Sequence, residues 1–89
     1  MLKLNITIQV IKFFRLLPAK QYRQVFNRIV ALMEDPEPPD SSPLIGYPYR
    51  RADIGEYRII YRVEEDCLKV ALVGKRNDDE IYLQLSRWR

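Results

Sequence analysis

The sequence lacks histidine altogether and contains a single cysteine, Cys67. Without histidine, the chain has no Ser-His-Asp or Cys-His catalysis, no histidine general base and no histidine metal ligand. One cysteine excludes an intramolecular disulfide and a thiolate zinc site, and it is typical of a protein of the reducing cytoplasm. Because Cys67 lies in an apolar run, we expect it to be a buried and unreactive thiol.

Glycine and long apolar runs are also scarce. The three glycines, Gly46, Gly55 and Gly74, are scattered, which excludes a glycine-rich phosphate loop. Polar residues interrupt the apolar segment 1–14, which has no small-residue cleavage site, so we predict neither a signal peptide nor a membrane span. The acidic run 78–80 is the one metal candidate, but consecutive residues of an extended chain point to opposite sides. We therefore expect no metal, no small-molecule cofactor and no membrane association.

Acidic residues are missing from one long stretch of the chain. The net charge is +3, yet residues 12–28 carry five basic side chains and no acidic one. Positive charge concentrated on a folded surface is typical of proteins that bind polyanions. The chain has 89 residues, which is enough for one modest core, and we expect a single domain over 1–89. The chemistry that remains available is that of arginine, lysine and tyrosine.

Hydrophobic periodicity indicates a strand and two helices in the first half of the chain. Residues 2–8 alternate apolar and polar side chains, which predicts a strand. Two helical patterns follow at 10–17 and 18–35, and their junction near Pro18 favours an antiparallel hairpin that covers a sheet. Five of the six prolines lie between residues 35 and 49, so we predict an extended connection there without regular structure.

The second half of the chain has the pattern of antiparallel β-structure. Turns near Gly55-Glu56 and at 64–66 separate three strand patterns, which predict a meander. The last segment, 75–89, fits a strand or a helix, and the alternation of its isoleucine and leucines favours the strand. We therefore predict an α+β fold with an N-terminal strand, a two-helix antiparallel hairpin and a three- to four-stranded antiparallel sheet.

The strand sequence EYRIIYRV carries two arginines among core residues. Its alternation places Arg58 and Arg62 on the face that the helices leave uncovered. Arg76 ends the neighbouring strand and is expected to converge on Arg58, and Tyr82 to return to the same edge. The pattern fits Arg58 equally well as a structural ion pair or as a phosphate ligand, whereas the acidic residues after Arg62 favour an ion pair. The Lys75-Arg76 pair also fits a salt-bridged turn.

Three segments of the chain together resemble a known family. They read FFRLLPAKQYRQVFNRIVALMEDP, DIGEYRIIYRV and LKVALVGKRNDDEIY. The resemblance is to the RelE branch of the RelE/ParE superfamily of bacterial toxins, and it spans essentially the whole chain. The motifs G-[DE]-YR-[IV]-[IV]-Y and VGKR-x(4)-[IV]-Y together are fairly specific to this family.

This resemblance implies the toxin of a type II toxin–antitoxin system, a ribosome-dependent mRNA endoribonuclease that inhibits translation. Such toxins cut mRNA in the ribosomal A site without a metal, when the 2′-hydroxyl attacks the adjacent phosphate and leaves a 2′,3′-cyclic phosphate. The implied partners are a RelB-type antitoxin, the 70S ribosome with its 16S rRNA, and mRNA. The chain has more large apolar residues than so small a core can bury, and the excess agrees with an antitoxin interface. The candidates are Leu16, Leu17, Leu85 and Trp88.

The same resemblance assigns catalytic roles to three residues. Arg58 falls on the arginine that stabilises charge on the scissile phosphate. Arg76 falls on an arginine that either has a similar role or acts as the acid that assists the leaving 5′-oxygen. Tyr82 falls on a tyrosine that stacks on or orients the nucleotide and assists the 2′-hydroxyl. The further RNA-binding candidates are Arg50, Arg51, Arg62 and Lys75.

One position departs from the family pattern. Family members carry basic residues on the preceding strand, and Arg51 occupies one such place, with Arg50 as its substitute if the hairpin register is shifted. The second basic position is Asp53 here, and in RelE this neighbourhood is thought to supply the general base. The identity of the base therefore stays open.

Three other functions fit parts of the pattern. ParE-type members of the same superfamily act on DNA gyrase and generally lack the full nuclease set. A toxin homologue that only binds antitoxin fits the substitution at Asp53. A general RNA-binding protein fits the basic residues, and it predicts cleavage-free binding whose affinity falls steeply with salt.

Overall fold

The structure is a computed structural model that describes residues 1–77 and 80–87. Within these residues, no helix is long and apolar enough to cross a lipid bilayer. The elements, in chain order, are β1 (Lys3–Ile6), α1 (Ile8–Leu16), α2 (Ala19–Glu34), β2 (Ser42–Pro43), β3 (Arg50–Ile54), β4 (Tyr57–Glu64), β5 (Cys67–Lys75) and α3 (Glu80–Arg87).

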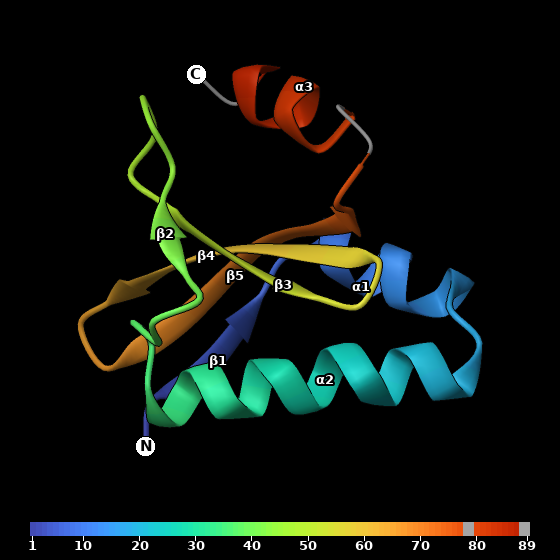
Figure 1. Cartoon of the computed structure of the whole chain (residues 1–89), viewed down its shortest axis with the longest axis horizontal. Coiled ribbons are helices and arrows are strands. Elements are labelled where there is room, and N and C mark those ends of the chain that lie inside the picture. The colour runs from blue at the N-terminus through green and yellow to red at the C-terminus, as the bar shows by residue number, and fades with distance from the viewer. Residues whose placement is uncertain (78–79, 88–89) are drawn as a thin grey trace.

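Five strands form one mixed sheet in the order β1-β5-β4-β3-β2 (Figure 1). β2 to β5 pair antiparallel in succession, and β1 pairs parallel to β5. α1 and α2 cover one face of the sheet, and α3 lies over the other (Figure 1). The predicted α+β fold, with its N-terminal strand, helical hairpin and antiparallel strands, is confirmed. The absence of regular structure predicted for 35–49 is wrong at β2, because an edge strand tolerates the proline at its outer side.

The face under α1 and α2 carries the larger part of the core. α2 contributes Val25, Ile29 and Leu32, whose spacing of three and four residues turns them to one side of the helix. The hydroxyl of Tyr61 donates to the carbonyl of Pro36 at 2.6 Å, so its polar end is satisfied although the ring is buried. The buried side chains of this layer are Val10, Val25, Ile29, Leu32, Ala52, Tyr57, Ile59, Tyr61, Leu68, Val70 and Val73.

The C-terminal segment is a helix, so the strand favoured by its alternation is wrong. Ile81 and Leu85, one turn apart, are buried against Ile60 and Leu72, whereas Leu83 is 51% exposed. A strand would place Ile81, Leu83 and Leu85 on one face, whereas the helix turns Ile81 and Leu85 onto the sheet and Leu83 away from it. As a result, α3 covers the middle of the face that the sequence predicts to be uncovered.

A two-residue turn at Gly55 and Glu56 joins β3 to β4. Gly55 has φ +56°, a left-handed conformation that favours glycine, and a β-carbon there would meet Gln24 Nε2 at 2.8 Å. The turn fixes the register of the hairpin and sets Asp53 directly opposite Arg58.

The predictions for single apolar residues have mixed outcomes. Leu16 is 81% exposed, as an interface residue would be, but Leu85 is buried, at 1% exposure, because α3 turns it onto the sheet. Leu17 is half-buried, and Trp88 lies outside the described residues. Cys67 is half-exposed rather than buried, since it begins β5 at a surface turn.

Candidate functional site

The guanidinium of Arg58 lies at the centre of the candidate site. Its Nε and Nη2 donate to the two carboxylate oxygens of Asp53, at 2.7 and 3.1 Å. Its Nη1 donates to the hydroxyl of Tyr82, and the guanidinium carbon lies 6.0 Å from the centre of the Tyr82 ring. The Arg58 side chain is only 13% exposed, so the two partners and α3 shield it from water.

Both charges of this pair are stabilised by their surroundings. The pKa of Asp53 is lowered, chiefly by the hydrogen bonds from Arg58, while burial opposes the shift and the nearby charges of Arg51 and Arg76 add to it. The pKa of Arg58 is raised, first by the bond to Asp53 and then, against the effect of burial, by the bond to Tyr82. Asp53 is therefore an anion and Arg58 a cation at neutral pH.

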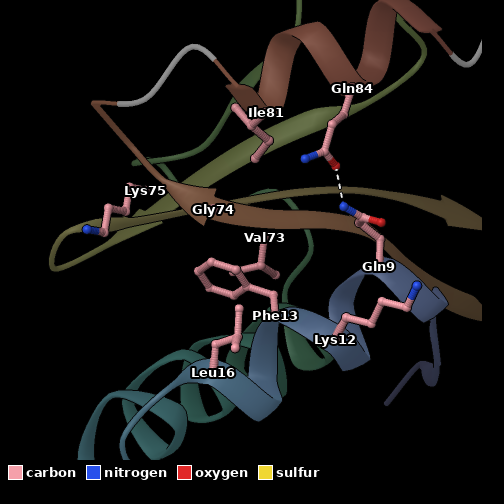
Figure 2. A pocket seen from close by; sticks show the side chains of 9 residues that line it. All are labelled: Gln9, Lys12, Phe13, Leu16, Val73, Gly74, Lys75, Ile81 and Gln84. Atoms are coloured by element: carbon pink, nitrogen blue, oxygen red, sulfur yellow. Dashed lines mark hydrogen bonds between the residues drawn. The ribbon is translucent and has the colours of Figure 1, made fainter.

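Tyr82 reaches Arg58 because α3 packs directly on the sheet. Figure 2 shows Ile81 pointing from α3 toward β5, where it packs next to Gly74. Gln9 of α1 donates from Nε2 to Gln84 Oε1 at 2.6 Å, which ties α3 to α1 (Figure 2). A hollow of about 320 Å³ lies between these two helices and β5. Arg58 and Tyr82 do not line it, so the candidate site lies elsewhere.

Arg76 stands just beyond the end of β5, at the same end of the sheet as Arg58. Gly74 pairs with Arg58 across the two strands, and the backbone N–H of Arg76 donates to the carbonyl of Glu56 at 2.9 Å. The side chain of Arg76 is exposed, and no acceptor among the described residues bonds its guanidinium. Its charge nevertheless acts on Asp53. The structure therefore brings Arg58 and Tyr82 into contact and leaves Arg76 at the rim.

Of the two basic candidates on β3, Arg51 shares the face of Arg58. Arg51 pairs with Ile60, whereas Arg50 pairs with Tyr61 and so points to the opposite face. Arg51 donates from Nε to Ser42 Oγ at 3.1 Å. Arg50 instead contacts the proline-rich connection, through Ser41 at 2.9 Å and Glu37 at 3.5 Å.

The remaining RNA-binding candidates, Arg62 and Lys75, lie apart from Arg58. Arg62 pairs with Glu64 through Nη2 and lies 5.2 Å above the centre of the Tyr49 ring. The ion pair expected for Arg62 is therefore present. Lys75 pairs with Tyr57 and lies on the other face of the sheet, where it lines the hollow of Figure 2 and extends outward.

The sequence does not predict the contacts that Asp53 and Tyr49 make with the arginines of β4. Asp53 departs from the family pattern, yet it is the main partner of Arg58. The two-residue turn between β3 and β4 is the feature of the sequence that places Asp53 opposite Arg58. For Tyr49, the sequence shows only an aromatic ring and does not predict its place beside Arg62.

Among the described residues, no three His, Cys, Asp or Glu side chains cluster to hold a metal. Asp78 and Asp79 of the candidate metal run lie outside the described residues.

The arrangement offers cations and an aromatic ring rather than a nucleophile. A planar guanidinium donates to two oxygens of one phosphate at once and stays protonated. A tyrosine ring next to it offers a surface on which a base can stack. Such a site suits a phosphodiester whose negative charge grows during a reaction.

The family model described as "ParE toxin of type II toxin-antitoxin system, parDE" matches residues 9–80 of the chain. No curated protein sequence matches this chain.

Solved structures of toxins share the fold. The chain is similar to the archaeal RelE-RelB complex from Pyrococcus horikoshii OT3, with 29% identity, a TM-score of 0.73, and 84% of this chain and 94% of that chain covered. It is similar to the isolated E. coli RelE toxin, with 23% identity, a TM-score of 0.75, and 98% and 97% covered. The YoeB/ParE toxin from Agrobacterium tumefaciens matches at 23% identity and a TM-score of 0.71, with 83% and 98% covered.

Proposed function

The chain belongs to the family of ParE toxins of type II toxin–antitoxin systems, within the RelE/ParE group, and we propose that it is an mRNA endoribonuclease of the RelE type. In this proposal it acts in the cytoplasm, on mRNA in the A site of the 70S ribosome, and contacts the 16S rRNA there. A RelB-type antitoxin holds it inactive. Complexes of RelE with RelB among the structures of the same fold support the antitoxin partner.

The observation that carries the proposal is the contact between Arg58 and Tyr82, with Arg51 on the same face and Arg76 at the same end of the sheet. These four residues come from β3, β4, the end of β5 and α3. A fold with no use for an RNA phosphate would not be expected to gather three cations and a tyrosine there, because like charges repel one another. Asp53 offsets only part of that charge.

The proposed reaction is transesterification within the RNA. The 2′-hydroxyl releases its proton to water as its oxygen bonds to phosphorus, the bond from phosphorus to the 5′-oxygen breaks, and the 5′-oxygen takes up a proton from water. Arg58 and Arg76 stabilise the charge that gathers on the phosphorane oxygens, and Arg76, which stays protonated, also donates a hydrogen bond to the leaving 5′-oxygen. Tyr82 orients the nucleotide. Asp53 is a weak base because its pKa is lowered, so we do not assign it the proton of the 2′-hydroxyl.

Purified ribosomes programmed with mRNA test the proposal. The chain should cut mRNA at codon positions in the A site and leave cyclic phosphate ends, and Arg76→Ala should lower the rate by about 10²–10³-fold. Arg23→Ala is the matched control, since Arg23 is an exposed arginine on α2, which packs on the opposite face of the sheet. Intact mRNA with the unaltered chain would reject the nuclease.

Inhibition of DNA gyrase is the second candidate function. The matching family model is that of ParE toxins, and Asp53 already occupies the guanidinium of Arg58. Gyrase-dependent DNA damage with intact mRNA would favour this alternative. Antitoxin binding with neither activity would identify a homologue that only binds antitoxin.

A further inference from the structure

We infer that Asp53 is an internal substitute for the RNA phosphate, which occupies the guanidinium of Arg58 until a substrate displaces it. This inference rests on the proposed function, because it concerns the same site. It assigns a role to Asp53, which occupies a position where members of the toxin family have a basic residue.

The geometry of the pair is that of a bound oxyanion. Two oxygens of one carboxylate accept from Nε and Nη2 of Arg58, at 2.7 and 3.1 Å, which is the side-on arrangement in which a guanidinium also binds two oxygens of a phosphate. Nη1 is engaged by Tyr82. A phosphate can therefore reach the side-on edge of Arg58 only by displacing Asp53.

The structure also offers Asp53 a place to go when it is displaced. Asp53 lines a small polar hollow of about 120 Å³ together with Asp40, Ser42 and Arg51. The positive charge of Arg51 already acts on the carboxylate, and Arg51 lies on the same face of β3, two residues away. Rotation of Asp53 toward Arg51 exchanges one cationic partner for another and frees the edge of Arg58.

An anion attached to the chain competes far better than a free one. Its effective concentration next to Arg58 is on the order of millimolar or higher, so free phosphate or an unattached RNA end gains little by displacing it. A substrate that is already held by other contacts gains the full interaction with Arg58. Asp53 therefore makes the site selective for RNA that is presented in a fixed position.

Binding of inorganic phosphate, measured by calorimetry, tests the inference on the folded full chain. Asp53→Asn should bind phosphate about tenfold more tightly than the unaltered chain, because a neutral amide competes less well than a carboxylate. Glu34→Gln is the control for the loss of one negative charge: Glu34 is exposed at the end of α2 and has no ion pair among the described residues, so its loss should leave the affinity unchanged. The gain should disappear in the double variant Asp53→Asn, Arg58→Ala.

Equal or weaker phosphate binding by Asp53→Asn would overturn the inference, and so would a gain that persists without Arg58. Circular dichroism checks that each variant is folded, and Asp53→Ser replaces Asp53→Asn if the amide prevents folding. The outcome is separate from that of the proposed function, since phosphate affinity is measured without ribosomes. An Arg58-dependent gain beside intact mRNA would confirm that Asp53 competes with phosphate for Arg58 and would reject the nuclease that uses the site.

Discussion

Two arginines of β4, Arg58 and Arg62, lie on the same face with Ile60 between them, and each has a carboxylate and a tyrosine beside it. Arg58 takes its carboxylate from β3 and its tyrosine from α3, so three elements meet at one guanidinium. Arg62 takes its carboxylate from Glu64, two residues further along the same strand, and lies over Tyr49.

The two surroundings differ in how completely they satisfy the guanidinium. Arg58 uses Nε, Nη1 and Nη2 and is 13% exposed. Arg62 is 32% exposed, and its Nε has no hydrogen-bond partner among the described residues. The same residue type on one strand thus forms a long-range, shielded cluster at one end and a local surface pair at the other. The first arrangement, which depends on the whole fold, is the one we associate with function.

The largest expected difference between the two ends is in cleavage. Arg58→Ala should lower the rate of mRNA cleavage by about 10²–10³-fold, because a donor to the transition state is lost, whereas Arg62→Ala should change it only a few-fold. Cleavage on purified ribosomes measures both, after thermal unfolding has shown that each variant is folded. Equal losses would mean that the two arginines have equivalent roles.

The two tyrosines should differ in the same direction. Tyr82→Ala should lower cleavage by an amount that corresponds to about 1–3 kcal/mol, the range for a ring that stacks on a base. Tyr82→Phe keeps the ring but loses the hydroxyl that accepts from Arg58, and it should retain most of the activity. Tyr49→Ala is the control at the other end of the strand. An equal effect at Tyr49 and Tyr82 would count against the assigned site.

The pH dependence of stability should also reflect the Asp53–Arg58 pair. The pKa of Asp53 is lower in the folded chain than its ordinary value, so the pair contributes stability that is present above the unfolded pKa, about 3.9, and is lost as the pH falls through the folded pKa. The melting temperatures of the unaltered chain and Asp53→Asn should therefore differ most at neutral pH and converge in acid. In an Arg58→Ala background this pH-dependent difference should shrink, and a difference that widens in acid would contradict the assignment.

The smallest effect is expected at Glu64. Glu64→Gln removes the partner of Arg62, but the pair is at the surface, with side chains 32% and 44% exposed. Its loss should change the free energy of unfolding by no more than about 1 kcal/mol. Chemical denaturation measures this change, and a loss of several kcal/mol would show that the Arg62 end supports the fold as strongly as the Arg58 end.

The sequence predicted the architecture well because the patterns of α2, β4 and β5 are long and regular. Alternation along β4 also predicted that Arg58 and Arg62 face away from α1 and α2. It did not predict α3, because Ile81 and Leu85 fit both the alternation of a strand and one turn of a helix. The apolar surface of Ile60 and Leu72, which is known only once the sheet is formed, favours the helix.

The pairing of Asp53 with Arg58 shows the same limit at the candidate site. Two residues five positions apart meet only if the turn between them has two residues, and the register followed from Gly55 and Glu56 once the turn was known. The contact between Arg58 and Tyr82 depends on the position of α3, which no local sequence pattern predicts. Arg76 was expected to converge on Arg58, and it lies at the same end of the sheet.

Mapping RNA 5′ ends in bacterial cells after brief induction tests the central claim most directly. The unaltered chain should produce new ends inside coding regions, in register with codons, and only where ribosomes translate; Arg58→Ala and Arg76→Ala should produce few. Unchanged 5′ ends during growth arrest by the unaltered chain would contradict the account.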